Sequence, residues 1–350
     1  MHFSQVSAEF ADKFFELVDS VNNIVVTAHV SPDSDSIASV LSVYEILTTR
    51  NPQKNIRIIY SAEPQDHFCV FQNHEKIEFV QDNADHLDQT ELLIMLDGGQ
   101  YSRFSIYPEK LQRIPYTVCI DHHSSPISDF SLSLVVPSSS SCAQLVYSAL
   151  CGDLTISPRL AEVFLLGILG DTGNFNYLKP TQTDTLMIAK KMIEIANVEI
   201  QEFQSRYQSI PKRAFELVKV LMKNTAFSSS PNWPDYQYSY IGKAVIDTGE
   251  FSDSEVSEAC GIYLSHFLRT VTGFTWGFVI TPRSSGECSI SLRSLPRSVS
   301  VRDLMERMGL GGGHDRAAGG TFKKTAKVVL VSKCLKQIRA WLNLHDPVLV

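Results

Sequence analysis

The chain has 350 residues, of which 44% are hydrophobic, and a formal net charge of −7. That length suffices for two domains with separate cores. The negative charge argues against a long basic groove for nucleic acid, but it is compatible with a small anionic ligand held through metal ions. The seven cysteines are scattered without a CxxC pair, which fits the reducing cytoplasm better than a disulfide framework. We expect no membrane span and no signal peptide.

The first half of the chain alternates short apolar runs with longer helix-like stretches, which is typical of an α/β domain. We expect strands at residues 23–30, 56–60, 92–97 and 116–121, and helices at residues 36–50, 141–150, 158–169 and 183–196. Several of the strands are apolar at consecutive positions, which indicates parallel strands buried on both faces. Ligands of such sheets lie beyond the carboxyl ends of the strands, so we expect a functional site there.

The pattern changes after Asn197. Two helical stretches, residues 199–208 and 211–223, lead into a polar break at residues 227–237. Beyond it we expect strands at residues 238–247, 271–281 and 288–294, and helices at residues 252–268, 301–308 and 325–343. The chain therefore divides into a first domain over residues 1–197, a helical linker over residues 198–237 and a smaller α/β domain over residues 238–350.

The segment HVSPDSD places an imidazole and two carboxylates directly after the first expected strand. His29 ends the strand, and Asp33 and Asp35 follow a proline turn with one residue between them. Alternate carboxylates in a tight turn can supply oxygen ligands to two adjacent cations, and an imidazole suits manganese, zinc or iron. The alternative is a loop whose aspartates cap the helix that begins near Ser36.

Acidic and imidazole residues also follow the later strands and one helix. Asp97 precedes two glycines, the triplet Asp121-His122-His123 ends another strand, and Asp171 ends an apolar helix. Each of these residues also has an alternative role that needs no metal: the aspartates could cap a helix or stabilise a turn, and the two histidines could be an exposed pair in a loop. Two adjacent imidazoles point to opposite sides, so that one can bind a metal while the other faces a substrate. If the sheet gathers them, the ligands of a two-metal site acting on phosphorus would be His29, Asp33, Asp35, Asp97, His122 and Asp171.

The segment LGGGHDRAAGG places His314 after three consecutive glycines, Gly311, Gly312 and Gly313. Glycine-rich backbone lets several amide groups face an anion, and His314 can add a hydrogen-bond donor. Upstream, Arg293 and Arg297 are candidates for paired contacts with a phosphate. The alternatives are an ordinary glycine turn and solvated arginines.

Five segments in this order, HVSPDSD, LLIMLDGG, IDHH, LGDTGNF and GGGHDRAAG, resemble the DHH phosphoesterase superfamily with its DHH-associated C-terminal domain. The resemblance covers nearly the whole chain and is closest to the NrnA-like branch of nano-RNases and pAp phosphatases. It implies a parallel-sheet DHH domain and a smaller α/β C-terminal domain, joined by a helical linker. The active site would lie in the cleft between them.

The resemblance also implies a role for each candidate residue. One divalent cation would be held by His29, Asp33 and Asp97, and a second by Asp35, Asp97, His122 and Asp171. Manganese is the expected ion, with magnesium or cobalt as substitutes. Asp121 would orient the neighbouring imidazole, and His123 would face the phosphate. The substrate's terminal nucleotide would be held by Arg293, Gly311, Gly312, Gly313 and His314.

Three positions need separate mention. Ala38 and Leu310 stand where the family usually has glycine, which puts the shape of the substrate pocket in question. Arg103 matches a family arginine, and we leave it outside the site. None of these positions replaces an expected ligand.

The expected function is that of a cytoplasmic, manganese-dependent phosphoesterase that releases mononucleotides from short oligonucleotides and also acts as a 3′-phosphatase on pAp. One alternative is a cyclic-dinucleotide or pApA phosphodiesterase, because those enzymes use the same two domains. An alternative of another class is a non-catalytic nucleotide-binding protein. The expected partners are short oligonucleotides or small nucleotide phosphates. The residues are compatible with a homodimer.

Overall fold

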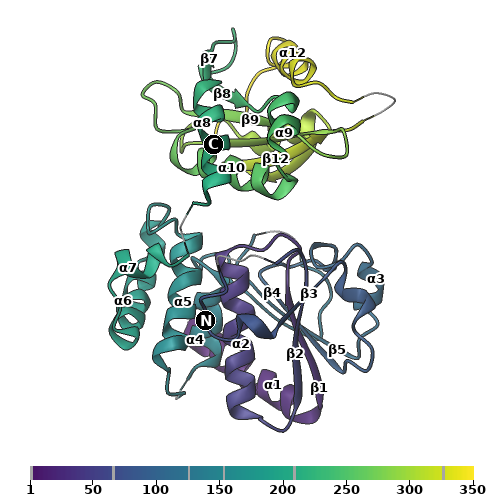
Figure 1. Cartoon of the computed structure of the whole chain (residues 1–350). Helices are drawn as coiled ribbons and strands as arrows, with labels where there is room; N and C mark the ends of the chain where they lie inside the picture. Colours follow the sequence, from purple (N-terminus) through teal and green to yellow (C-terminus); the bar gives the residue numbers. More distant parts are fainter. Residues whose placement is uncertain (1–2, 65–67, 125–126, 153, 208–209, 325–327) are drawn as a thin grey trace. The chain divides into compact units, whose positions relative to one another are not determined.

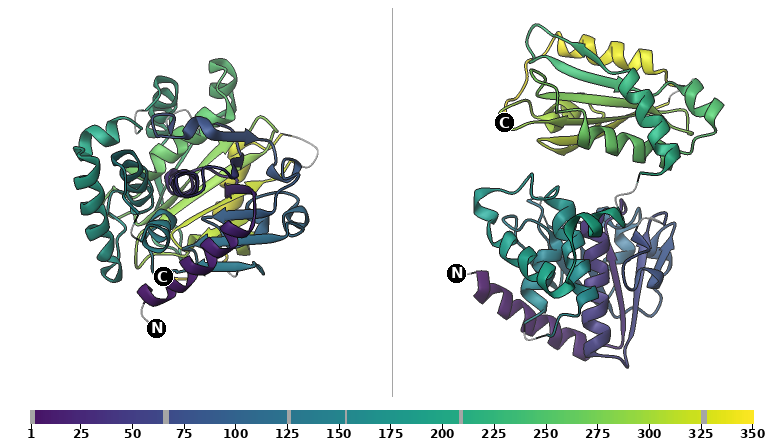
Figure 2. Two further views of the ribbon diagram at one scale, coloured as in Figure 1. Left: turned by 90° about the horizontal axis from the view of Figure 1, so that it is seen from below. Right: turned by 60° about the vertical axis from the view of Figure 1, so that its left-hand side comes forward.

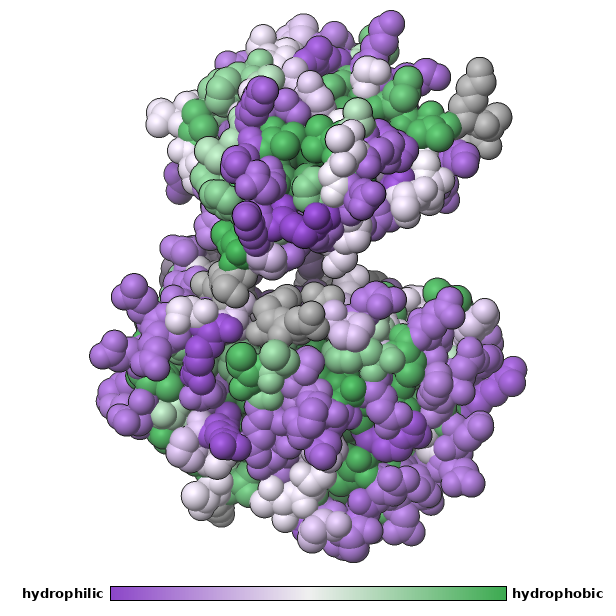
Figure 3. Space-filling model, in the orientation of Figure 1, coloured by the Kyte–Doolittle hydropathy of each residue, from purple (hydrophilic) through white to green (hydrophobic). Residues whose placement is uncertain are grey.

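The computed structural model describes residues 3–64, 68–124, 127–152, 154–207, 210–324 and 328–350. The chain forms two compact units, Met1–Ser209 and Ile210–Val350 (Figure 1). The expected linker spans this division, because α7 (Ile200–Ser205) lies in the first unit and α8 (Lys212–Lys223) in the second. Polar residues cover most of the visible face of each unit, with apolar residues in small separate groups (Figure 3).

The first unit contains a six-stranded, fully parallel sheet in the order β3-β2-β1-β4-β5-β6. Its strands are β1 (Asn23–Ala28), β2 (Asn55–Ser61), β3 (Ile77–Val80), β4 (Leu92–Leu96), β5 (Tyr116–Asp121) and β6 (Leu132–Val135). The parallel sheet predicted from consecutive apolar positions is confirmed, and all five residues of β4 are buried. The edge strands β3 and β6 were not predicted, because each has only four residues and is partly exposed.

Helices cover both faces of this sheet (Figures 1 and 2). The helices of this unit are α1 (Phe3–Ser20), α2 (Ser34–Arg50), α3 (Pro108–Leu111), α4 (Cys142–Leu150), α5 (Pro158–Asp171) and α6 (Asp184–Ala196), with α7 as above, and α6 packs on α5. Helices α2, α4 and α5 share the larger core with β1 residues Ile24 and Val26. Val25, on the other face of β1, packs in a smaller core with Tyr101 of the short helix η4 (Tyr101–Arg103). Strands β1, β2 and β4 therefore each contribute to both cores.

The second unit contains a mixed sheet in the order β11-β12-β10-β9-β8-β7, in which only β8 and β9 are parallel. Its strands are β7 (Ala226–Ser228), β8 (Tyr236–Tyr240), β9 (Trp276–Pro282), β10 (Cys288–Ser294), β11 (Gly311–His314) and β12 (Ala317–Phe322). Its further helices are α9 (Lys243–Gly249), α10 (Asp253–His266), α11 (Val301–Arg307) and α12 (Val331–Leu342). Phe278 and Ile280 pack with α11 and α12, whereas Val279 packs with α8 and α10.

Several expectations for the second unit were wrong. The strand expected at residues 238–247 ends at Tyr240, because Gly242 caps the helix α9 that follows it. The strand expected at residues 271–281 begins only at Trp276. The helix expected at residues 325–343 begins at Val331, and residues 325–327 lie outside the described part of the chain. Among the described residues, no helix combines the length and the apolar character needed to cross a bilayer.

Candidate metal centre

Three of the candidate site residues lie at the carboxyl ends of three neighbouring parallel strands. His29 directly follows β1, Asp97 directly follows β4, and Asp121 is the last residue of β5. The register pairs the last residue of β1 with the last residue of β4, and the latter with Ile120 of β5. Parallel strands aligned in this way bring their polar tips to one edge of the sheet, as the sequence predicted.

Asp97 has a left-handed backbone conformation, with φ of +59°. Few residues other than glycine adopt this region, although aspartate and asparagine are enriched there. The amide of Asp97 still donates to the carbonyl of Ile120 at 3.0 Å, so the chain turns sharply while it remains attached to β5. Backbone strain of this kind is concentrated at ligand-binding positions.

The first group of candidate ligands is His29, Asp33 and Asp97. His29 Nε2 lies 3.2 Å from Asp97 Oδ2 and 3.5 Å from Asp33 Oδ2. The other oxygen of Asp33, Oδ1, accepts a hydrogen bond from the amide of Ser36 at 2.9 Å and caps α2. The Ser36 hydroxyl in turn accepts from the buried hydroxyl of Tyr60 at 2.7 Å. One carboxylate of the loop therefore caps the helix and also faces the candidate site.

The second group is Asp35, His122 and Asp171, with Asp97 beside them. His122 Nε2 lies 3.0 Å from Asp171 Oδ2, 3.3 Å from Asp97 Oδ1 and 3.8 Å from Asp35 Oδ2. A ring nitrogen carries at most one proton, which cannot satisfy three carboxylates. Among the described residues, His122 Nε2 and Asp97 Oδ1 are buried without a hydrogen-bond partner. A divalent cation fits this set of oxygen and nitrogen donors.

The N-terminus of α4 fixes the position of Asp35. Asp35 Oδ2 accepts from the amide of Cys142 at 2.6 Å, and Oδ1 accepts from the amide of Ala143 at 2.9 Å. These are the first amides of the helix, which have no partner within the helix and favour a negative charge. The fully buried carboxylate is therefore held in place by backbone donors before any cation binds.

Two glycines on one face of α5 allow the end of this helix, with Asp171, to approach the first turn of α2. A Cβ on Gly167 would lie 2.8 Å from Asp35 Oδ1, and one on Gly170 would lie 2.4 Å from the Cβ of Ser34. Both distances are too short for any side chain. These packing residues were not predicted, although two glycines three residues apart in an apolar helix are the signal that could have identified them.

Asp121 holds the imidazole of His123. Asp121 Oδ1 lies 2.7 Å from His123 Nδ1 and also accepts from the amide of His123 at 3.1 Å. The rings of His122 and His123 lie 4.7 Å apart at an angle of 61°. Nε2 of His122 lies close to the carboxylates of Asp35, Asp97 and Asp171. In contrast, Nδ1 of His123 is held by Asp121, the last residue of β5.

The buried carboxylates shift the pKa values of the site. Burial opposes the charged form of the His29 imidazole, but Asp33 and Asp97 outweigh it and raise the pKa of His29 to about 10. Burial also opposes the ionisation of Asp97, yet His122 and His29 hold its pKa well below the ordinary value. The pKa of Asp35 is raised, first by burial and then by the nearby charge of Asp171. The site thus holds four carboxylates but only two neighbouring imidazoles, those of His29 and His122. This leaves an excess of negative charge, which a cation would balance.

The substrate-binding residues expected from the sequence lie in the second unit. Arg293 of β10 pairs with Ala317 of β12, and Ala317 pairs with His314 of β11. Residues paired across strands share a face of the sheet, so Arg293 and His314 lie in one row with the small side chain of Ala317 between them.

The glycine run is a strand at the edge of the second sheet and not the turn considered as an alternative. A Cβ on Gly311 would lie 2.1 Å from the carbonyl oxygen of Gly319, and Gly313 has φ of +141°. Side chains at these two positions would separate β11 from β12 or strain it. The close strand pairing therefore accounts for glycine at both positions.

The two departures from the family pattern lie in packed positions. Ala38 is fully buried between α2 and α5, 3.0 Å from a Cβ placed on Gly167. Leu310 packs against the core that α11 and α12 share. Arg103 ends η4, and its carbonyl accepts from the amide of Val30 at 2.9 Å, which ties η4 to the residue after His29.

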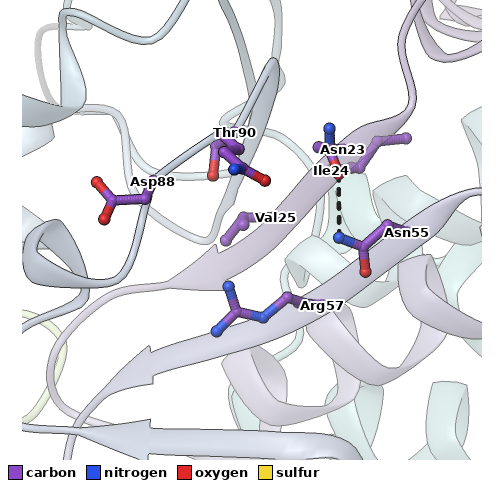
Figure 4. A pocket seen from close by; sticks show the side chains of 8 residues that line it. Asn23, Ile24, Val25, Asn55, Arg57, Asp88 and Thr90 are labelled. Carbon is purple, nitrogen blue, oxygen red and sulfur yellow. Dashed lines mark hydrogen bonds between the residues drawn. The ribbon is translucent and has the colours of Figure 1, made fainter.

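A small polar pocket lies at the other end of the first sheet (Figure 4). It is lined by the first residues of β1 and β2, Asn23 and Asn55, whose side chains are joined by a hydrogen bond of 3.0 Å. The guanidinium of Arg57 there is held by both carboxylate oxygens of Glu78, at 2.6 and 2.8 Å. This pocket is therefore separate from the candidate metal centre, which lies at the carboxyl ends of the strands.

Comparison with known families matches both units. The model described as "DHH family, N-terminal domain" matches residues 23–168, and the model described as "DHHA1 domain" matches residues 237–343, together more than two thirds of the chain. The chain belongs to the DHH phosphoesterases. This DHH phosphoesterase is therefore a hydrolase of phosphoric esters. Enzymes of this family use divalent metal ions. The chain falls in the NrnA-like branch of the family.

Individual proteins resemble this DHH phosphoesterase along most of its length. A relative from Thermus thermophilus, named "Bifunctional oligoribonuclease and PAP phosphatase NrnA", is 28% identical over 86% of this chain and 84% of its own. A "Cyclic-di-AMP phosphodiesterase GdpP" from Geobacillus thermodenitrificans is 24% identical over 95% of this chain but only 48% of its own. The solved structure of an exopolyphosphatase-related protein from Bacteroides fragilis has a TM-score of 0.81 at 20% identity and covers 96% of this chain and 97% of its own, which shows the shared fold alone.

Proposed function

We propose that this DHH phosphoesterase hydrolyses short oligonucleotides to mononucleotides and also removes the 3′-phosphate of pAp. The observation that carries the proposal is the pair of ligand groups that meet at Asp97, at the carboxyl edge of the parallel sheet. The NrnA relative matches both units, so the proposal draws on the DHHA1 unit as well as on the metal centre.

We assign two divalent cations to the site, with manganese as the preferred ion because mixed imidazole and carboxylate donors suit it. One would be held by His29, Asp33 and Asp97, and the other by Asp35, Asp97, His122 and Asp171. When bound, such a pair of ions supplies a nucleophile at neutral pH and stabilises the charge that develops at phosphorus. The buried, unpartnered Asp97 Oδ1 and His122 Nε2 support this assignment.

The side chains of the chain itself have separate tasks. With Nδ1–H of His123 held by Asp121, the ring would face a phosphate oxygen with Nε2, which donates a hydrogen bond there when the ring is the doubly protonated imidazolium. In the DHHA1 unit, we assign Arg293 and His314 to the phosphate and sugar of the terminal nucleotide, because they share one row of the sheet. The glycine strand, Gly311, Gly312 and Gly313, would let the substrate lie close to backbone.

A cyclic-dinucleotide or pApA phosphodiesterase is the second candidate. It is supported by the GdpP relative, which matches 95% of this chain. The non-catalytic alternative has less support, because the six candidate ligands form two groups, and the ligand atoms within each group lie within 4.8 Å of one another. The two catalytic candidates differ in substrate and not in the groups that act on phosphorus.

A direct assay separates these functions. Purified protein with manganese would be incubated with end-labelled RNAs of two to ten nucleotides, with pAp, with pApA and with cyclic di-AMP. We expect the shortest RNAs to be hydrolysed fastest and a chelator to abolish the activity. A preference for cyclic di-AMP would favour the second candidate, and activity that survives the chelator would contradict the metal assignment.

The matched variant for this assay is Asp97→Asn. Asparagine also adopts the left-handed conformation of Asp97, so the change removes the charge and leaves the turn intact. We expect a loss of hydrolysis of at least about 100-fold with a normal fold. Asp88→Asn, at an exposed position near the amino ends of the strands, is the control and should behave as the wild type.

A further inference from the structure

The segment that follows Asp171 has an unusual backbone. Gly173, Asn174 and Phe175 are consecutive left-handed residues, with φ of +53°, +56° and +69°. Glycine and asparagine tolerate this region, but a phenylalanine there is rare. Such conformations persist only where surrounding contacts impose them, and they are concentrated at sites that hold ligands.

Hydrogen bonds tie this segment back to the end of α5. The Thr172 hydroxyl, which is buried, donates to the carbonyl of Ile168 at 2.6 Å and accepts from the amide of Phe175 at 3.1 Å. The amide of Tyr177 donates to the carbonyl of Thr172 at 2.9 Å. Phe175 also packs against the main core of the first unit. The segment is therefore fixed to the helix whose last residue is the candidate ligand Asp171.

This segment holds the ring of Tyr177 directly over Gly173. A Cβ on Gly173 would lie 2.4 Å from Tyr177 Cε2, so only glycine leaves room for the ring. Tyr177 is nevertheless 53% exposed. Gly173 is two residues from Asp171, so their α-carbons are at most about 7.6 Å apart. A half-exposed aromatic side chain is thus held by a fixed segment that directly follows the candidate ligand Asp171.

We propose that Tyr177 is a stacking platform for the base of the nucleotide whose phosphate occupies the candidate metal centre. The proposal rests on the proposed function and adds a substrate contact to it. Bases stack on aromatic side chains in a manner that tolerates any sequence, because every base has a π-face. The turn itself does not need an exposed ring, since Thr172 and Phe175 already hold it.

The test is a kinetic comparison of three variants on a dinucleotide. Tyr177→Ala removes the ring, and we expect KM to rise about tenfold with little change in kcat, as expected for the loss of one stacked base. Tyr177→Phe keeps the ring and should restore most of the affinity. Tyr116→Ala is the control, because Tyr116 is 44% exposed at the amino end of β5, away from the metal centre. Its KM should equal that of the wild type.

Two further measurements distinguish stacking from a general effect on the site. The defect of Tyr177→Ala should vanish on a dinucleotide analogue that lacks the base. The fluorescence of a 2-aminopurine dinucleotide should be quenched on binding to the wild type and much less on binding to Tyr177→Ala. An unchanged KM and unchanged quenching in Tyr177→Ala would overturn the proposal and leave the proposed function standing. If the wild type hydrolyses no nucleotide, the proposed function fails, and the quenching still decides whether Tyr177 stacks on a base.

Discussion

Gly167 of α5 lies directly against the carboxylate of Asp35. A Cβ on Gly167 would lie 2.8 Å from Asp35 Oδ1 and 2.5 Å from the Cβ of Ala143, whose amide donates to that same oxygen. The absence of a side chain on α5 therefore permits both the hydrogen bond and the close approach of three helices. Asp171 lies four residues later in α5, so this packing contact also determines the position of its carboxylate relative to the other candidate ligands.

The first prediction follows from this contact. Gly167→Ala should destabilise the protein by about 1 to 3 kcal/mol, because the added methyl group overpacks a filled core. It should also weaken binding of divalent cations, because it displaces the Asp35 carboxylate. Gly261→Ala is the matched control, since no atom lies within 4 Å of a Cβ at this exposed position of α10. That variant should gain about 0.5 to 1 kcal/mol. Denaturant unfolding and metal titration measure both effects, and equal changes in the two variants would refute the packing argument.

The second prediction concerns the hydroxyl of Tyr60. It donates to Ser36, whose hydroxyl also accepts from the amide of Asp33 at 2.9 Å and donates to the carbonyl of Asp33 at 3.1 Å. Tyr60→Phe should cost about 1 kcal/mol and weaken binding of a divalent cation about tenfold, because Asp33 loses this support. Tyr101→Phe removes a buried hydroxyl that bonds Thr117 at 3.0 Å, and it should lower stability alone. Calorimetric titration with manganese tests the difference, and equal affinities in the two variants would contradict it.

The third prediction concerns the contact between Asp121 and His123. Asp121→Asn keeps the shape of the side chain but removes the charge that holds His123 Nδ1. We expect kcat to fall about 100-fold, the size of effect usual for a misplaced proton donor, while two cations still bind. Asp129→Asn, at an exposed position, is the control. Loss of metal binding in Asp121→Asn would instead indicate that this aspartate supports the ligands themselves.

The fourth prediction is that cation binding releases protons. Because the pKa of His29 is raised to about 10, its imidazole is protonated in the metal-free protein at neutral pH, and a metal ligand must be neutral. Apparent affinity should therefore rise with pH until about 10. The ion pairs of His29 stabilise the metal-free fold below its unfolded-state pKa, and this contribution is lost as pH rises through about 10. Calorimetry in two buffers with different ionisation enthalpies measures the released protons, and identical heats would exclude the release.

Parts of the fold follow from local sequence patterns, and other parts depend on contacts between distant segments. Strands β1, β4 and β5 are recognisable because burial on both faces demands apolar residues at consecutive positions. Helix α9 was missed because it has only seven residues and follows a strand after a short break. The pairing of β11 with β12 was missed because it depends on the close approach of two glycine-rich segments and not on any local propensity.

The candidate site shows the same division. Its six acidic and imidazole residues were recognisable because they follow strands and one helix, and parallel strands place those positions at one edge. The left-handed turn at Asp97 and the two hydrogen bonds from α4 to Asp35 could not be predicted from the sequence, because both arise from tertiary packing. The alternatives of cap and ligand for Asp33 were not exclusive, since each oxygen has a different neighbour.

The double use of Asp33 has a consequence for the lifetime of the protein. The carboxylate that faces His29 also closes the first turn of α2, and α2 packs against α5 through Ser34 and Gly170. A cation that orders Asp33 would therefore also order the start of α2 and the end of α5. The unfolded chain offers no such arrangement, so bound metal would shift the folding equilibrium by mass action. Scarcity of the ion would then expose the chain to proteases, and metal supply would govern the abundance of the enzyme as well as its rate.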